Sequence, residues 1–151
     1  MPGYPGGSVG AFNRLITAHH EAGHAVAHVL GGGRVTEVKI LGERSGVMVP
    51  KENTPIPGRE LEFLAMILAG HEAGVRFLTT YGGFGRSAAN RALRKAGAHD
   101  LARFPGYARG TGISESTARS RARSLVASHW GRIHRVAVKL DRSGRLTHGQ
   151  I

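Results

Sequence analysis

The segment from Arg59 to Thr80 constrains the fold more than any other part of the sequence. Apolar residues recur along it at the three- and four-residue spacing of one helix face, which predicts a long buried helix. Pro57 and Gly58 stand just before it and mark a helix start. The apolar positions are Leu61, Leu64, Ala65, Leu68, Ala69, Val75 and Leu78. We expect this helix to be the main element of the core.

Two further elements are predicted ahead of that helix. Asn13 is a candidate N-cap for a helix over residues 14–30, and the glycines at 31–33 end it. Residues 35–41 and 46–50 are predicted strands. The polar turn between them would join the two strands into a hairpin.

Two helices are predicted after the core helix. An arginine-rich segment from Ser87 to Phe104 forms the first, and Pro105 with Gly106 ends it. Ser114 caps the second, a single long helix whose apolar stripe runs over residues 118–140.

This succession predicts an α+β fold that is mainly α-helical, with a small β-hairpin after the first helix and a helical C-terminal part. A chain of 151 residues has the usual size of one domain, which we expect to cover residues 13–151. Residues 1–12 are expected to be a disordered arm, because four glycines and two prolines occupy residues 1–10. No run of about 18 uncharged apolar residues and no signal-peptide pattern occurs, so we expect a cytoplasmic protein without a membrane segment.

The net charge of +11 is carried entirely by the second part of the chain. Residues 1–85 hold seven basic residues and seven glutamates, whereas residues 86–151 hold 14 basic and three acidic residues. Such a field favours nucleic acid or another acidic partner. An ordinary solvated helix surface is an equally open interpretation.

His20 to His24 form the pattern H-E-x-x-H on the first predicted helix. Two histidines four residues apart project from one helix face, so a single metal ion can bridge them. Because the chain has no cysteine, imidazole and carboxylate groups must hold any metal, and this donor set suits zinc. Glu21 would then serve as general base in amide hydrolysis. Histidines on the surface, or satisfied inside the core, are the alternative.

Other histidines accompany this pattern. His71-Glu72-Ala73-Gly74 repeats its first four residues, but Val75 replaces the second histidine. Because His71 and Glu72 lie on the predicted core helix, one of them could orient a ligand imidazole, with simple exposure as the alternative. His19 and His28 are weaker candidates for supporting or solvent-exposed positions.

The motif and its surroundings resemble the zinc peptidase domain of the FtsH-type ATP-dependent metalloproteases. Residues 17–26 resemble the TAxHEAGHA signature of that family. Residues 38–41 and 46–50 resemble its two strands after the zinc helix, and residues 59–70 resemble its next helix. The resemblance covers most of the chain and implies a zincin-like fold with Zn²⁺ as the cofactor.

The resemblance also implies the members of the site. Both histidines of the pattern would bind the zinc ion, and Glu21 would be the catalytic residue. Residues 97–101 resemble the family's GAxxDL segment, whose aspartate is the third zinc ligand, and this implies Asp100. The other aspartate of the chain, Asp141, lies in a predicted exposed turn. The competing candidates for the third ligand are Glu72, His71 and His99.

These features lead us to expect a zinc metallopeptidase without its own ATPase motor. Family members carry a membrane anchor and an ATPase module ahead of the peptidase, whereas this sequence holds no Walker-type loop. We therefore expect it to hydrolyse flexible or unfolded polypeptides, or to work with a separate unfoldase. A substrate strand could add to the edge of the hairpin, and the oligomeric state stays open.

The second hypothesis is a basic binding protein with a structural or vestigial metal site. Arginines of the last predicted helix would contact nucleic-acid phosphates or an acidic partner, and binding would depend steeply on salt. The arginines concerned are Arg119, Arg121, Arg123, Arg132 and Arg135.

Overall fold

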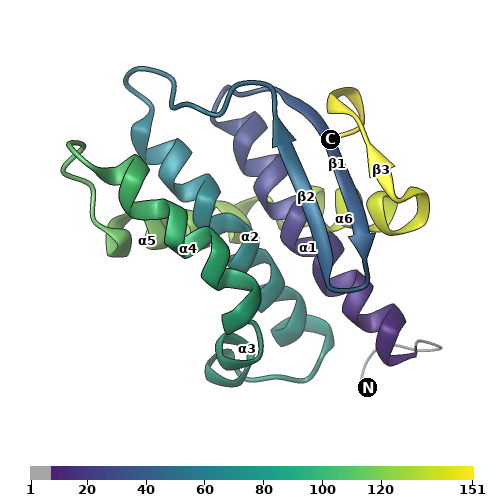
Figure 1. The fold of residues 1–151 in the computed structure, drawn as a ribbon. Coiled ribbons are helices and arrows are strands. Elements are labelled where there is room, and N and C mark those ends of the chain that lie inside the picture. The colour runs from purple at the N-terminus through teal and green to yellow at the C-terminus, as the bar shows by residue number, and fades with distance from the viewer. Residues whose placement is uncertain (1–7) are drawn as a thin grey trace.

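Two long helices form the centre of the fold (Figure 1). The computed structural model describes residues 8–151, and in it α1 (Val9–Leu30) packs against α2 (Glu60–Tyr81). The two backbones come close at Gly23, where an added Cβ atom would lie 2.6 Å from the carbonyl oxygen of Ala69. Only glycine fits at this crossing. Because α2 matches the predicted core helix within one residue at each end, that prediction is confirmed.

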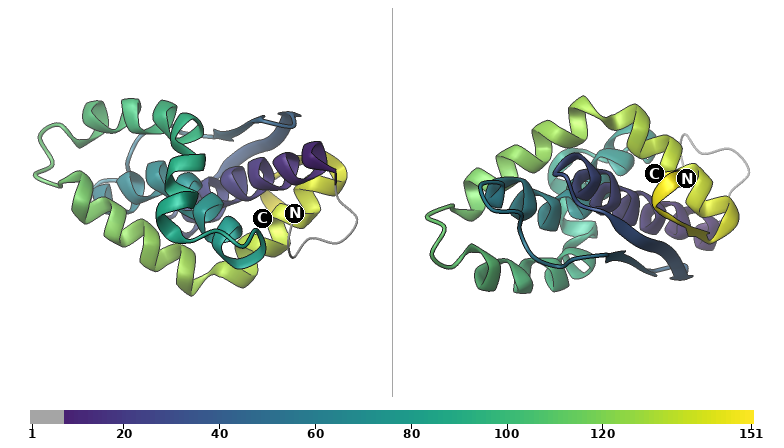
Figure 2. Two further views of the ribbon diagram at one scale, coloured as in Figure 1. Left: turned by 90° about the horizontal axis from the view of Figure 1, so that it is seen from below. Right: turned by 90° about the horizontal axis from the view of Figure 1, so that it is seen from above.

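Helix α1 is enclosed by α2, the sheet and α6 (Trp130–Ser143) (Figure 2). In the structure His19, His24 and His28 are all buried. The helix therefore contributes to the core on more than one side, and its histidines lie in distinct surroundings.

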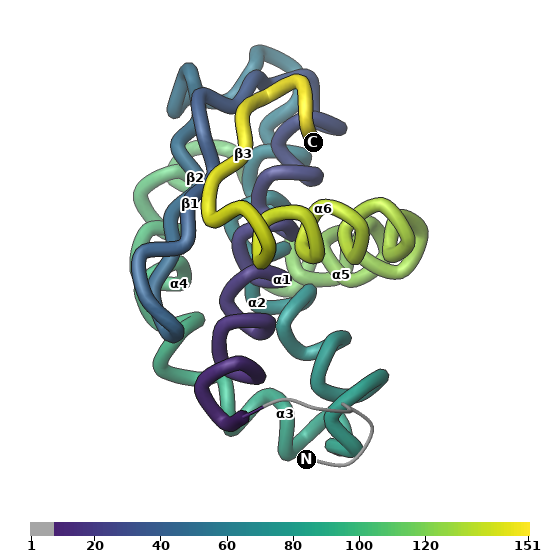
Figure 3. The backbone as a smooth tube through the Cα atoms, turned by 90° about the vertical axis from the view of Figure 1, so that its right-hand side faces the viewer, coloured from purple at the N-terminus to yellow at the C-terminus, as the bar shows by residue number. Residues whose placement is uncertain are grey.

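A three-stranded antiparallel sheet lies beside α1, in the strand order β2-β1-β3. The hairpin of β1 (Val35–Gly42) and β2 (Ser45–Pro50) confirms the prediction for this region. The third strand, β3 (Arg145–Leu146), pairs with β1 from the other end of the chain (Figure 3). Within residues 8–151 the outer edge of β2 has no partner strand. A short 3₁₀ helix, His148–Gln150, follows β3.

The predicted helix from Ser87 to Phe104 is two helices, α3 (Arg86–Ala92) and α4 (Arg94–Ala108). Leu93 breaks the helix and packs its side chain against α2 at Gly74, where an added Cβ atom would lie 2.9 Å from Leu93 Cδ1. Pro105 was expected to end the helix but lies inside its last turn, where it removes only one internal hydrogen bond. The neighbouring Phe104 is buried and Tyr107 packs on Phe63, which holds this turn in place.

The predicted single last helix is also divided, into α5 (Glu115–Ser128) and α6. Ser114 caps α5 as predicted, its side chain accepting a hydrogen bond from the backbone N–H of Thr117. His129 departs from helical geometry and the chain bends there (Figure 3). Because α5 packs mainly on α2 and α6 mainly on α1, one straight helix could not reach both neighbours.

The first helix begins earlier than the sequence suggested. Ser8, not Asn13, is the N-cap of α1, and its side chain accepts a hydrogen bond from the backbone N–H of Ala11. The burial of Phe12 explains the extension, because that side chain needs the added turn to reach the core beside Phe77. Of the predicted disordered arm at 1–12, residues 8–12 thus belong to the helix and its cap, and residues 1–7 lie outside the described residues.

The fold is α+β and mainly α-helical, which confirms the predicted class. The pattern H-E-x-x-H lies on a helix, the hairpin follows that helix, and the part after α2 is helical apart from β3. Among the residues described, no helix has the length and hydropathy needed to cross a bilayer.

Candidate metal centre

His20 and His24 lie one turn apart on α1, with their Nε2 atoms separated by 3.1 Å. Asp100 reaches them from α4, and its Oδ2 atom lies 3.0 Å from each of the two nitrogens. Three donor atoms from two helices therefore form a nearly equilateral triangle. Ligands held 2.0–2.1 Å from a tetrahedral zinc ion are about 3.3 Å apart, so a slight widening of this triangle would fit one ion.

Glu21 turns its carboxylate toward the same place. Its donor atom and those of His20 and His24 all lie within 4.8 Å of one another, and this group could hold a metal ion. The side chain is buried, and no hydrogen bond within residues 8–151 engages its carboxylate. Gly46 of β2 makes room for it, because an added Cβ atom there would lie 2.8 Å from Glu21 Cγ. The carboxylate is thus available to a ligand or to water.

The imidazole of His24 is held in one orientation by α2. Its Nδ1 lies 2.8 Å from the backbone carbonyl oxygen of Met66, which can only accept a hydrogen bond, so Nδ1 carries the proton. A cation that displaced the proton of Nε2 would therefore meet the lone pair of that nitrogen. A Cβ atom at Gly70 would collide with Nε2 of His24, so the absence of a side chain at this position lets the ring approach α2.

The electrostatics of the site favour a bound positive charge. Burial alone would lower the pKa of His24, but the Asp100 carboxylate, assisted by Glu21, outweighs it and raises the pKa to about 9. Burial would likewise raise the pKa of Asp100, but His24 and His20 hold it well below its usual range. The carboxylates therefore favour the protonated form of His24. A metal cation would compensate the same negative field.

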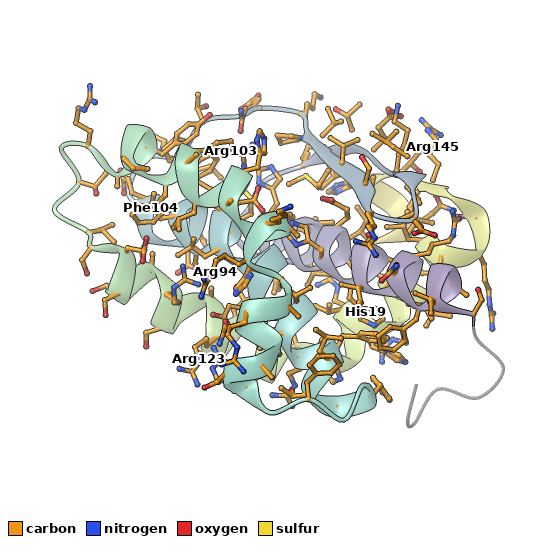
Figure 4. The ribbon with its side chains drawn as sticks, turned by 60° about the horizontal axis from the view of Figure 1, so that its bottom comes forward. His19, Arg94, Arg103, Phe104, Arg123 and Arg145 are labelled. Atoms are coloured by element: carbon orange, nitrogen blue, oxygen red, sulfur yellow. The ribbon has the colours of Figure 1, made fainter. Side chains whose placement is uncertain are left out.

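These groups open into a cavity of about 260 Å³ between α1, β2 and α4. Met48 of β2 and His99 of α4 also line it. Arg103 stands one turn after Asp100, with Nη2 4.0 Å from Asp100 Oδ1. In Figure 4 Arg103 and Phe104 lie on different sides of α4, and Arg103 is the one that lines the cavity. The candidate metal centre is therefore open to solvent.

The residues predicted to orient the ligands face other helices. His71 Nε2 lies 2.8 Å from the side-chain oxygen of Asn90 on α3, and Glu72 accepts hydrogen bonds from Arg86 and Arg119. Within residues 8–151 no hydrogen bond joins His71 or Glu72 to the triangle. The backbone carbonyl of Met66 orients the imidazole of His24, the role that was predicted for His71 or Glu72.

The other candidate histidines occupy three different settings. His99 is exposed at the cavity and makes no hydrogen bond within the described part of the chain. His19 contacts His134, with 2.9 Å between Nε2 and Nδ1, and burial lowers the pKa of His19 to about 4. His28 lines a separate cavity of about 180 Å³ at the end of α1.

Three contributors were missed at the level of sequence, namely Met66, Gly70 and Arg103. Gly70 carried a usable signal, because a glycine inside an apolar helix often marks a close approach. Arg103 follows Asp100 at helical spacing and could have been noted for that reason. The sequence held no signal for Met66, because its backbone carbonyl, and not its side chain, accepts the hydrogen bond from His24.

Comparisons with known proteins do not assign the chain to a family. No protein-family model matches the chain, and no curated protein matches it. The resemblance to the FtsH-type peptidase domain therefore depends on the motifs alone.

Proposed function

We propose that this chain is a zinc metallopeptidase that hydrolyses flexible or unfolded polypeptides in the cytoplasm. The observation that carries the proposal is the triangle of His20, His24 and Asp100 beside the unengaged carboxylate of Glu21. Two imidazoles and a carboxylate are a donor set that zinc accepts in catalytic sites, which keep a fourth position open. The resemblance to the FtsH-type peptidase domain points the same way.

The distances favour Asp100 over Glu21 as third ligand. Asp100 Oδ2 lies 3.0 Å from both histidine nitrogens, whereas the group that includes Glu21 spans up to 4.8 Å. Glu21 is thus left for acid and base chemistry. Zinc bound by this triangle would supply a Lewis acid that polarises the scissile carbonyl and acidifies water.

The side chains have separable tasks in such a reaction. Glu21 takes a proton from the attacking water and gives it to the leaving amine. Met66 keeps His24 in the tautomer that exposes Nε2, and Asp100 offsets part of the metal charge. Because both Glu21 oxygens are free of hydrogen bonds within residues 8–151, no partner competes for that proton.

The edge of β2 is suited to hold the substrate. Residues 45–48 of this strand line the cavity, and its outer edge is unpaired within residues 8–151. An extended polypeptide could add there by backbone hydrogen bonds, which require no particular side chains. A folded substrate would not present such a segment, which is why we propose flexible chains, or chains delivered by a separate unfoldase.

The central test is the variant Glu21→Gln. We expect it to bind about one zinc per chain, like the wild type, and to lose about 100-fold or more of its activity on an unstructured protein such as casein. Metal content would be measured by atomic emission and cleavage by gel electrophoresis. Cleavage at the wild-type rate by Glu21→Gln would contradict the mechanism.

Asp100→Ala tests the third ligand separately. This variant should lose most of its zinc, because a site with two protein ligands binds the ion weakly. Retention of the full zinc content would transfer the ligand role to Glu21 or His99. Asp141→Ala, which removes the other aspartate, is the matched control and should keep both zinc and activity.

A further inference from the structure

A second cavity, of about 250 Å³, is lined by one arginine from each of three helices, among other residues. Arg76 comes from α2, Arg86 from α3 and Arg123 from α5, and Ser124 adds a hydroxyl group. Elements from distant parts of the sequence thus direct positive charge at one place. Figure 4 shows Arg94, at the start of α4, on the same face of the molecule as Arg123.

One carboxylate, that of Glu72, also lines this cavity, but its negative charge is already paired with two arginines. The side chain of Glu72 is 2% exposed and accepts hydrogen bonds from Arg86 at 2.8 Å and from Arg119 at 3.5 Å. Arg123 and Arg76 have no acidic partner within residues 8–151. The cavity therefore keeps an excess of positive charge after every ion pair is counted.

Arg76 has hydrogen-bonding capacity that the protein does not use. Its guanidinium carbon lies 5.6 Å from the ring centroid of Trp130, an attraction that steadies the group without occupying its N–H donors. Its Nε is buried and has no hydrogen-bond partner in the described residues. Buried donors of this kind are costly unless a hydrogen-bond partner reaches them.

We infer that this cavity is a binding site for a phosphate group. Guanidinium groups match tetrahedral oxyanions with paired N–H donors and stay charged at every physiological pH. Because the arginines converge on one small cavity, a compact phosphate suits it better than an extended nucleic-acid backbone. Single-stranded nucleic acid also calls for aromatic stacking surfaces, and Trp130 is already engaged with Arg76.

The test is calorimetric titration of the full-length protein with inorganic phosphate and with methyl phosphate, at ionic strength held constant with sodium chloride. Wild type should show saturable binding at one site per chain. In Arg123→Gln the affinity should fall about tenfold or more, because a charge-assisted hydrogen bond is lost at an exposed side chain that the fold does not need. Binding of both compounds indicates that phosphate esters enter the cavity, and binding of phosphate alone indicates a site for the free ion.

Arg142→Gln is the matched control, because it removes one exposed arginine that does not line the cavity. It should bind phosphate like the wild type, and a loss equal to that of Arg123→Gln would overturn the inference by pointing to net charge alone. Phosphate held by the metal centre would survive Arg123→Gln, so an unchanged affinity in that variant would overturn it too. Binding of an oligonucleotide but not of phosphate would show instead a surface for nucleic acid.

Discussion

Two glycines shape the candidate metal centre, because they leave room for its side chains. Gly70 lets the ring of His24 approach α2, and Gly46 leaves space for Glu21. A methyl group at either position would occupy volume that the side chain of His24 or Glu21 already fills. Interiors are close-packed, so such a clash has to be relieved by moving one of the two partners.

Gly70→Ala should therefore weaken metal binding although it replaces none of the proposed ligands. We expect the zinc affinity to fall about tenfold or more, as is typical when the support of a ligand histidine is disturbed. Overpacking should also cost about 1–3 kcal/mol of unfolding free energy. Competition with a chromophoric chelator would measure the affinity, and urea denaturation the stability.

Gly106→Ala is the control for that prediction. Gly106 also lies in a helix, α4, but an added Cβ atom would meet nothing within 4 Å. This variant should keep the zinc affinity of the wild type. A similar loss of affinity in both variants would show that the effect is not local to His24.

At the scale of residues, the sequence predicted the positions of the site side chains that belong to a recognisable motif. Helical spacing alone was enough to place His20 and His24 on one face and Glu21 beside them. The resemblance to a known family pointed to Asp100, and the structure brings it within 3.0 Å of both histidines. His71 and Glu72 could not be assigned, because the rotation of α2 about its axis depends on packing with α3 and α5.

At the scale of helices and strands, periodicity predicted which elements exist but not where they break. The hairpin and α2 followed from local pattern. The bends at Leu93 and His129 did not. At His129 the main packing neighbour of the chain changes from α2 to α1, whereas α3 and α4 both pack on α2 and the break between them accompanies burial of the Leu93 side chain. The two-residue strand β3 has no pattern of its own and depends on β1 being already in place.

The cap of α5 offers a test at this scale. The Ser114 side chain accepts a hydrogen bond from the Thr117 backbone N–H at 3.1 Å, so Ser114→Ala leaves that donor without its partner. We expect a loss of about 1 kcal/mol in unfolding free energy, read as a lower urea midpoint. Ser116→Ala removes a hydroxyl from the first turn without removing a cap. An equal loss in that variant would contradict the role given to Ser114.

For the molecule as a whole, the uneven charge of the sequence is partly balanced by the fold. Arginines of the second part pair with glutamates of the first, as Arg121 does with Glu62 and Arg145 with Glu37, both at 2.9 Å. These pairs are partly exposed, so each contributes little stability by itself. The arginines proposed for nucleic-acid contact therefore divide into paired ones, such as Arg121, and unpaired ones within residues 8–151, such as Arg123.

Acid should destabilise the whole molecule partly through His28. Burial lowers the pKa of His28 from 6.5, helped by the nearby His148 and opposed by the carbonyl of Arg34. Below pH 6.5 the unfolded chain thus binds a proton that the folded chain does not, so the unfolding free energy falls as the pH drops through this range. Well above pH 6.5, His28 is neutral in both states and no longer lowers the unfolding free energy.

Replacing His28 with glutamine should make this dependence shallower. Urea denaturation would be followed between about pH 7 and pH 5, with chelator present throughout so that metal binding does not contribute. His129→Gln removes a histidine at the junction of α5 and α6 and serves as control. If the unfolding free energy became less dependent on pH by the same amount in both variants, burial of His28 would not be the cause of that dependence.

The hydrogen bond from His24 to the Met66 carbonyl means that one group of the candidate metal centre belongs to the backbone and does not depend on the identity of any side chain. Alanine scanning could not isolate this group, because every residue type brings the same carbonyl oxygen and truncation of the buried Met66 side chain would change only the core packing. The group can be lost only by displacing the backbone of α2, which also carries much of the core. A change of side chain at position 66 would therefore act through core packing, whereas the tautomer of His24 would be kept for as long as the fold is kept.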